Sequence, residues 1–255
     1  MTIDLVTVPC LADNYAFLLH DLASGATALV DAPEAEPVLA ALAARGWGLD
    51  EVWLTHHHHD HVGGLAAILA ATGARVTGAA ADAARLPALD RAVVPGEVFR
   101  FADQPVEVID VSGHTVGHVA FYLAGAELVF TGDSLMAAGC GRMFEGNAMD
   151  YWAALSRLSD LPGDPLVCSG HEYTTANLRF ALSLEPAQPD LISRSKRVAQ
   201  VRAAQRPSVP SRLSEERLTN PFLRAADPAL KAAMGLSEAP AADVFAAIRA
   251  AKDKF

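Results

Sequence analysis

Short apolar runs alternate with longer alanine- and leucine-rich segments over the first two thirds of the chain, and glycine or polar residues separate them. Short runs of this kind are typical of buried strands, whereas the longer segments are typical of helices. We predict strands at Ile3–Val8, Phe17–His20, Ala28–Val30, Glu51–Leu54, Val106–Val111, His118–Leu123, Glu127–Thr131 and Leu166–Ser169. We predict helices at Glu36–Arg45, Leu65–Ala71 and Tyr151–Leu158. The order of these elements indicates an α+β fold.

The pattern changes after residue 171, where strand signals fade and helical segments follow one another. These helices are predicted at Thr174–Leu184, Leu191–Gln205 and Ala241–Lys252. Pro207 ends the second helix, and Pro240 stands before the third, where the first turn of a helix tolerates proline. We therefore predict two domains, a mixed α/β domain at 1–171 and a helical domain at 172–255.

Composition narrows the class of protein. Apolar residues make up 51% of the 255 residues and charged residues 20%, so a disordered chain is excluded. The net charge is −10, whereas proteins that bind a phosphate backbone are usually basic. No apolar run reaches the roughly 18–20 residues that span a membrane. We therefore expect neither nucleic acid nor a membrane as a partner.

Two further features bear on the compartment. The first residues, Met1–Asp4, contain no basic region and carry an early acid, which argues against a signal peptide. The cysteines are too few and too scattered for a disulfide framework or a CxxC metal site; they are Cys10, Cys140 and Cys168. We expect a cytoplasmic protein with reduced thiols.

Histidine is concentrated at one place in the sequence. Five of the nine histidines lie within His56–His61, directly after a predicted strand. His56 and His58 are two residues apart, so both side chains project from the same side of an extended segment. Asp60 and His61 follow as the chain turns into a helix. This arrangement predicts a metal site, with two nitrogen ligands for one ion and an oxygen and a nitrogen for another.

Three further candidate ligands follow predicted strands downstream, each directly after a glycine. They are His114, Asp133 and His171. A glycine at such a place lets the backbone turn sharply and present the next side chain in a crowded site. Each signal is weak alone, but together with His56–His61 the three form an ordered series.

The series His-x-His-x-Asp-His, His, Asp, His resembles the metallo-β-lactamase superfamily. The resemblance implies a four-layer αββα sandwich with two divalent metal ions at one edge. It implies that His56, His58 and His114 bind the first ion, that Asp60, His61 and His171 bind the second, and that Asp133 bridges both. Imidazole and carboxylate ligands suit zinc, and also iron or manganese.

The resemblance also implies roles within the site. Two adjacent metals hold a bridging hydroxide near neutral pH, and this hydroxide is the nucleophile. Asp60 and Asp133 are then the catalytic carboxylates, with Asp60 orienting the nucleophile. His57 and His59 occupy variable positions of the motif and are expected outside the ligand set. His118 is expected to make a structural hydrogen bond beside the site.

Further segments resemble glyoxalase II, the hydroxyacylglutathione hydrolase family within that superfamily. They are Asp13–Tyr15, Cys140–Gly146, His171–Thr174, Asn177–Ala181, Asn220–Arg224 and Arg249–Phe255. The segments occur along the whole chain, including the helical region. The region 1–171 is thereby expected to be catalytic and 172–255 to bind substrate.

This resemblance implies hydrolysis of S-D-lactoylglutathione to D-lactate and glutathione, the second step of methylglyoxal detoxification. We expect a monomer, although no residue pattern indicates the oligomeric state. It places Arg142, Phe144 and Tyr173 at the glutathione site, with Arg249 and Lys252 on the glycine carboxylate. Arg249 and Lys252 are three residues apart and share a helix face, which suits an anionic substrate. Position 144 is phenylalanine where some members have tyrosine, so a ring hydroxyl contact is absent.

Other activities of the superfamily stay open at this point. The nearest is a persulfide dioxygenase with a single iron, which has a similar Gly-Cys-Gly-Arg loop. The segment Phe144–Gly146 and the long helical tail with Asn220–Phe222 disfavour it. Other hydrolases of the superfamily and a metal-binding protein without catalysis are further alternatives, although the ligand series has no gap.

Overall fold

The first sheet joins the N-terminal strands in sequence order. The computed structural model describes residues 3–255, so Met1 and Thr2, on which the expectation about an export signal partly rests, lie outside the described residues. The sheet contains β1 (Ile3–Cys10), β2 (Asn14–Asp21), β3 (Thr27–Val30), β4 (Glu51–Leu54), β5 (Arg75–Ala79) and β6 (Arg91–Val93). Strands β1 to β3 are antiparallel, and β3 to β6 are parallel. The helices between the parallel strands are α1 (Ala35–Arg45), α2 (His59–Val62) and α3 (Leu65–Thr72).

The second sheet has the strand order β14-β13-β10-β9-β8-β7. Its strands are β7 (Val98–Phe101), β8 (Gln104–Asp110), β9 (Val119–Leu123), β10 (Leu128–Gly132), β13 (Leu166–Ser169) and β14 (Ser211–Arg212). Only the β10–β13 pair is parallel. A small hairpin of β11 (Leu135–Met136) and β12 (Gly139–Cys140) follows β10, and α4 (Ala148–Ser159) connects it to β13.

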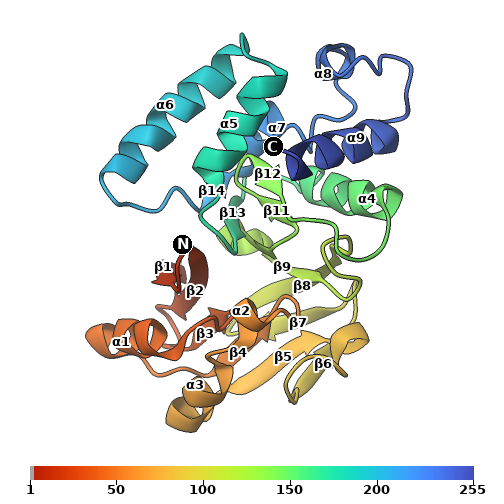
Figure 1. Ribbon diagram of the computed structural model, residues 1–255. Coiled ribbons are helices and arrows are strands. Elements are labelled where there is room, and N and C mark those ends of the chain that lie inside the picture. Colours follow the sequence, from red (N-terminus) through yellow and green to blue (C-terminus); the bar gives the residue numbers. More distant parts are fainter. Residues whose placement is uncertain (1–2) are drawn as a thin grey trace.

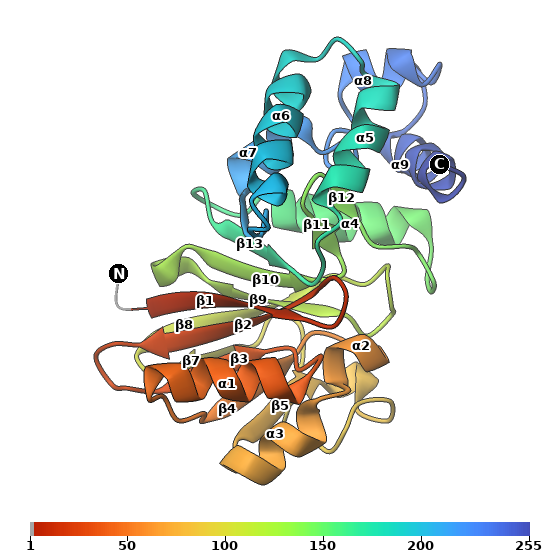
Figure 2. The same ribbon diagram turned by 60° about the vertical axis from the view of Figure 1, so that its left-hand side comes forward.

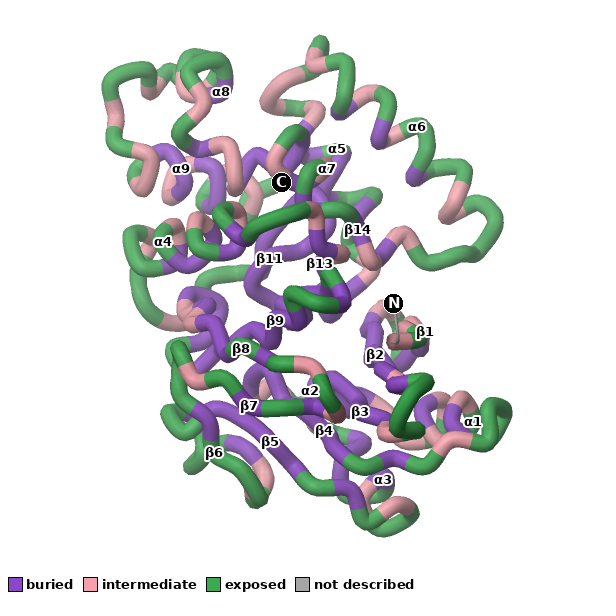
Figure 3. Tube along the Cα trace, turned by 180° about the vertical axis from the view of Figure 1, so that it is seen from behind, coloured by how far each residue is buried: buried purple, intermediate pink, exposed green. Residues whose placement is uncertain are grey.

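The two sheets face each other across an apolar core, and helices cover their outer faces (Figures 1 and 2). Between the sheets, the buried ring of Trp53 meets Phe99 and Phe121, with ring centroids 5.3 and 5.6 Å apart. A second core packs α1 and α3 against the first sheet, and a third packs α4 against the second. The strands are largely buried while the outer helix faces are exposed (Figure 3). The predicted αββα arrangement is therefore confirmed.

The rest of the chain is mainly helical and lies on the side of the second sheet (Figure 2). Its helices are α5 (Thr174–Leu184), α6 (Pro189–Ala203), α7 (Leu213–Thr219), α8 (Pro228–Ala233) and α9 (Ala241–Asp253). Phe245 of α9 packs against Tyr151 of α4, with ring centroids 5.3 Å apart. The last helix thus completes the apolar core of the second sheet.

A buried ion pair fixes α6 against α7. The side chains of Arg194 and Glu216 are 2% and 0% exposed, and Nη2 of Arg194 donates to Oε1 of Glu216. Glu216 Oε2 accepts hydrogen bonds from the backbone N–H of Ala138 and from Asn220 Nδ2. One carboxylate therefore joins the helical region to the turn between β11 and β12.

Several short elements differ from the sequence predictions. Strands β5, β6 and β7 and helices α7 and α8 were not predicted, because each is short and lacks a clear apolar run. Strand β2 begins at Asn14 rather than Phe17, since the polar Asn14 pairs with Cys10 across the sheet. No helix among residues 3–255 is long and apolar enough to cross a membrane. The division of the chain at residue 171 stays a prediction.

Candidate active site

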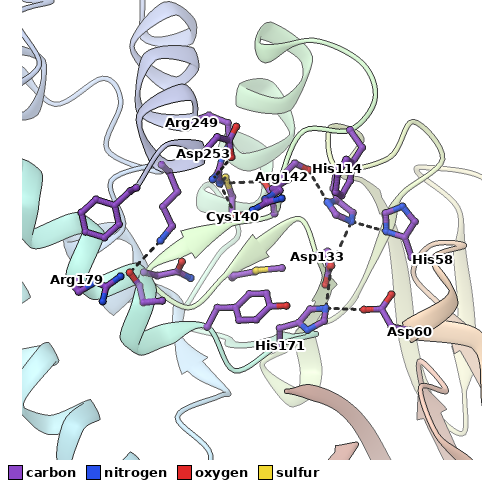
Figure 4. A pocket seen from close by; sticks show the side chains of 18 of the residues that line it. His58, Asp60, His114, Asp133, Cys140, Arg142, His171, Arg179, Arg249 and Asp253 are labelled. Atoms are coloured by element: carbon purple, nitrogen blue, oxygen red, sulfur yellow. Dashed lines mark hydrogen bonds and ion pairs between the residues drawn. The ribbon is translucent and has the colours of Figure 1, made fainter. Parts of the chain in front are cut away.

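Polar side chains converge where strands of both sheets end. The segment His56–His61 follows β4 and continues into α2, and Asp133 follows β10. His171 follows β13, while His114 lies in the loop between β8 and β9. Figure 4 shows His58, His114, Asp133, His171 and Asp60 facing one another along one side of a pocket. The fold therefore brings the sequence-predicted side chains to one place.

These side chains form groups with the spacing of metal ligands. There are three groups, and within each the candidate ligand atoms lie within 4.8 Å of one another. The first group is His56, His58 and His114, and the second is His56, His61 and Asp133. The third group is Asp60, His61 and His171. The first and third groups are the two sets expected from the sequence. Asp133 lies between them, with Oδ1 3.2 Å from His61 Nε2 and Oδ2 3.5 Å from His114 Nε2. Its position suits a carboxylate shared by two ions.

The histidines are held with one ring nitrogen facing the group. His61 Nδ1 lies 2.9 Å from Asp31 Oδ2, and His171 Nδ1 lies 2.9 Å from Asp13 Oδ1. His114 Nδ1 lies 2.7 Å from the backbone carbonyl of Arg142. Because these oxygens accept hydrogen bonds, each Nδ1 carries a hydrogen, and Nε2 is the ring atom that faces the group. A metal ion would bind at Nε2 in place of a proton.

Buried polar atoms in the group lack hydrogen-bond partners, which tests its fit to cations. Among residues 3–255, His56 Nε2 is buried without a hydrogen bond, and so is Asp133 Oδ1, despite its short distance to His61. His61 Nε2 faces His171 Nε2 at 3.3 Å, and His114 Nε2 faces His58 Nδ1 at 2.9 Å. Two facing ring nitrogens need a proton or a cation between them, and a metal ion there would take the lone pairs of both.

The electrostatics of the group agree with this fit. Burial opposes a charge on His171, but hydrogen bonds to Asp133 and Asp60 outweigh it and raise its pKa to about 10. Burial likewise opposes ionisation of Asp133, yet the charges of His61 and His171 hold its pKa well below the usual range. Burial lowers the pKa of His56, which favours its neutral, ligating form. The carboxylates of the group therefore favour a positive charge among the ring nitrogens, and either protons or metal ions can supply that charge.

Three nearby histidines, His57, His59 and His118, do not belong to these groups. His57 Nδ1 lies 2.8 Å from Asp82 Oδ2, and His59 is exposed at the pocket wall. His118 Nε2 accepts a hydrogen bond from the backbone N–H of Asp133, and its ring stacks on His56. His118 thus makes the structural hydrogen bond expected beside the site.

A cavity of about 860 Å³ opens beside the ligand groups and extends to the last helix. The side chains of Arg142, Phe144 and Tyr173 line it, as expected from the sequence. Phe144 is 62% exposed and its ring centroid lies 5.2 Å from that of His114. Tyr173 stacks on His171 at 4.7 Å with nearly parallel rings. An aromatic rim therefore adjoins the candidate metal ligands.

Arg249 and Lys252 also line the cavity, but their surroundings differ. Arg249 is 5% exposed; its Nη1 donates to the carbonyl of Cys140 at 2.9 Å, and its Nη2 donates to Asp253 Oδ1 at 2.8 Å. Its Nε donates to the same oxygen and its Nη1 also to the carbonyl of Gly141 at 3.5 Å, so these four contacts leave one of its five N–H donors free. Within the part of the chain that the structure describes, Lys252 Nζ makes a single hydrogen bond, to the carbonyl of Ala176. Lys252 is thus the more available of the two.

Some residues of the site were missed by sequence reasoning. Asp31 follows β3 with φ of 57° and accepts hydrogen bonds from both the backbone N–H and the hydroxyl of Thr55. Asp31 and Asp13 hold His61 and His171, respectively. The sequence did contain a signal for Asp31, namely an acidic residue directly after a predicted strand. That strand is parallel to β4, so Asp31 lies at the same edge of the sheet as His56.

Gly170 lies where no side chain fits. A Cβ at this position would lie 2.5 Å from His61 Cε1 and 2.7 Å from Asp133 Oδ1. We expect Gly170→Ala to displace both groups and to lower kcat/KM about 100-fold, since small misplacements of reacting groups have effects of that size. Steady-state kinetics and the metal content per chain measure the effect. Gly48→Ala is the matched control, because a Cβ there meets nothing within 4 Å; equal activity of both variants would contradict the prediction.

Comparisons with known proteins agree with the geometry. Residues 15–171 match the metallo-beta-lactamase superfamily, and residues 172–255 match the hydroxyacylglutathione hydrolase C-terminus. The hydroxyacylglutathione hydrolase of Roseobacter denitrificans is 60% identical over 255 residues, which cover 100% of both chains. A hydroxyacylglutathione hydrolase of Cereibacter sphaeroides is also 60% identical, with the same coverage.

Solved structures share the fold. ETHE1 from Myxococcus xanthus has a TM-score of 0.64 at 25% identity and covers 99% of this chain and 98% of its own. TTHA1623, solved in a di-iron-bound form, has a TM-score of 0.57 at 28% identity. The match covers 66% of this chain and 91% of TTHA1623. The BLEG-1 B3 metallo-beta-lactamase, with a TM-score of 0.67 at 17% identity and coverage of 86% and 99%, supports the fold alone. The resemblance inferred from the sequence is confirmed, and the chain belongs to the hydroxyacylglutathione hydrolase (glyoxalase II) family of the metallo-β-lactamase superfamily.

Proposed function

We propose that this enzyme hydrolyses S-D-lactoylglutathione to D-lactate and glutathione, the second step of methylglyoxal detoxification. One observation carries the proposal: a converged set of histidine and aspartate ligands lies at one end of a cavity whose other end carries the ammonium of Lys252. The name of the full-length relatives that are 60% identical supports the substrate class.

We propose that the ligand groups hold two divalent metal ions, with Asp133 shared between them. His56, His58 and His114 would hold one ion, and Asp60, His61 and His171 the other. Zinc is our first choice, while iron and manganese suit the same imidazole and carboxylate donors. When bound, such a pair lowers the pKa of water towards neutrality and polarises a carbonyl oxygen.

Asp60 is the carboxylate best placed to orient the attacking water. Its side chain is 44% exposed toward the cavity, and its Oδ2 lies 3.4 Å from His171 Nε2. Hydrogen bonds from His171 and Asn14 help to hold its pKa below the usual range, so Asp60 is an acceptor at neutral pH. We propose that Asp60 accepts a hydrogen bond from the water and aims it at the thioester carbonyl.

The thiol portion of the substrate would extend along the cavity. We propose that Phe144, Tyr173 and Arg142 contact its peptide, while Lys252 and Arg249 attract its glycine carboxylate. A thiol has a pKa near 8.5, so the thiolate leaves without a dedicated general acid. Cys140 is not a nucleophile in this proposal, because burial raises the pKa of its thiol to about 11.

We propose that the protein works in the cytoplasm as a monomer. We also propose that residues 1–171 form the catalytic domain and residues 172–255 the substrate-binding domain. The buried free thiols of Cys10, Cys140 and Cys168 support a reducing compartment.

Lys252 gives the proposal a pH dependence. Burial, followed by the charges of Arg249 and Arg179, lowers the pKa of Lys252 to about 8. The ammonium is therefore present below pH 8 and lost as the pH rises through this value. We expect kcat/KM to fall above about pH 8 while kcat does not, because a bound carboxylate keeps Lys252 protonated. Lys252→Gln should raise KM and remove this decline; a decline that persists in the variant would assign it to another group, such as the amine of the substrate.

The decisive test is turnover of S-D-lactoylglutathione by purified protein, with metal analysis of the same sample. We expect release of one glutathione thiol per thioester consumed. Oxygen uptake with glutathione persulfide, without thioester hydrolysis, would support the persulfide dioxygenase alternative instead. Full metal content without either reaction would support a metal-binding protein without catalysis.

A further inference from the structure

The cavity contains a cation that the expected substrate site does not include. Arg179 projects from α5 into the cavity, whereas Arg249 and Asp253 come from α9 (Figure 4). The guanidinium carbon of Arg179 lies 5.1 Å from the centroid of the Phe255 ring. Lys252 Nζ lies 5.5 Å from the same centroid. Two cations from different helices therefore lie beside one aromatic ring.

Neither cation forms an ion pair within residues 3–255, and the charge of Asp253 acts on Lys252 only from beyond ion-pair distance. Within the described chain, residues 3–255, the Arg179 side chain makes neither a hydrogen bond nor an ion pair, only its contact with Phe255. Lys252 has the single hydrogen bond to a backbone carbonyl. The carboxylate of Asp253, which also lines the cavity, is held by Arg249.

Like charges placed side by side do not stabilise a fold. Burial lowers the pKa of Lys252 most, and the positive charges of Arg249 and then Arg179 lower it further. A pair of unpartnered cations on a cavity wall is the arrangement expected where an anionic ligand supplies the opposite charge.

We propose that Arg179 is a further substrate-binding residue, which together with Lys252 holds the terminal carboxylate of the thiol portion of the substrate. This inference rests on the proposed function. A free guanidinium presents paired N–H groups that match both oxygens of a carboxylate, while the lysine adds a point charge. The Phe255 ring supports both cations. Arg249, with most of its donors engaged, attracts the same carboxylate and also fixes Asp253 and the Cys140–Gly141 backbone.

The proposal makes Arg179 a determinant of specificity. Thioesters whose thiol carries a carboxylate at this end should be preferred to thioesters of the same length that end in a neutral amide. The candidate metal ligands lie at the other end of the cavity, away from Arg179 (Figure 4), and the acyl group would be placed there, so the chemical step should not depend on Arg179.

The test compares two substrates and three variants. The substrates are S-D-lactoylglutathione and its glycinamide analogue, in which a carboxamide replaces the glycine carboxylate. The variants are Arg179→Gln, Arg179→Lys and the control Arg100→Gln, which removes one exposed positive charge on β7 outside the cavity. We expect Arg179→Gln to raise KM for S-D-lactoylglutathione about tenfold with kcat within twofold, which is the loss of one charge-assisted contact. The KM for the amide should not change, and Arg179→Lys should recover part of the loss.

Binding without turnover gives an independent measurement. Calorimetric titration with S-methylglutathione should show an affinity about tenfold weaker for Arg179→Gln than for Arg100→Gln. Equal KM changes on both substrates, or unchanged KM and affinity, would overturn the role of Arg179. Absence of hydrolysis by the unaltered protein would overturn the proposed function instead, and the titration would still report on Arg179.

Discussion

We expect Asp133→Asn to lower kcat on S-D-lactoylglutathione by about 10³-fold or more, because preorganised charges at a reacting centre contribute on this scale. Asp133 is buried and lies within 3.5 Å of ring nitrogens from His61, His114 and His171. An amide keeps the shape but removes the negative charge on which both proposed ion positions depend. The histidines of the two sets would then be left without their shared counter-charge.

The measurement combines kinetics with the metal content per chain after dialysis. Asp103→Asn is the matched control, because this carboxylate is fully exposed on the surface. The control should match the unaltered protein in both readouts. Full metal content together with normal kcat in Asp133→Asn would contradict the assignment of a shared carboxylate.

The largest expected effect on stability comes from Arg194→Ala. This change leaves the Glu216 carboxylate buried without its counter-charge, and breaking a buried pair by removing one partner costs about 3–5 kcal/mol of unfolding free energy. The hydroxyl of Thr219 also loses the Nη1 donor of Arg194. Urea unfolding followed by circular dichroism should show a midpoint shifted to lower urea concentration.

Two further variants separate charge from packing. Arg197→Ala removes an exposed arginine from the same helix, whose pairing with Glu215 should contribute only about 0–1 kcal/mol. In Arg194→Met with Glu216→Gln, no charge is left buried, so we expect the double variant to be more stable than Arg194→Ala. If Arg197→Ala and Arg194→Ala shift the midpoint equally, burial of the ion pair is not what makes it important.

The sequence was most informative where chemistry is concentrated in a short segment. His56–His61 supplies ligands for both proposed ions from one strand end, so its meaning did not depend on the rest of the fold. The residues that hold those histidines were not found in this way. Asp13 and Asp31 are ordinary surface-type residues in the sequence, and only strand pairing brings them to His171 and His61.

For the fold and the substrate pocket too, local sequence patterns were predicted correctly, whereas contacts between distant segments were not. Long apolar runs and Ala/Leu-rich helices were predicted, whereas β5 to β7 were missed because short strands depend on their neighbours more than on their own composition. Helix spacing placed Arg249 and Lys252 on one face, and the structure does bring both to the cavity. Helix spacing could not indicate that Arg249 already donates hydrogen bonds to Asp253. Nor could it indicate that Arg179, which belongs to another helix, lies near Lys252.

The cavity wall runs from His58, near the start of the chain, to Phe255 at its last residue. During synthesis the metal ligands up to His171 leave the ribosome well before α9 does. In the order of synthesis, the candidate ligands therefore precede the part of the cavity wall that Lys252 and Phe255 supply. A chain that lacks α9 has an incomplete cavity even when all of its candidate ligands are present.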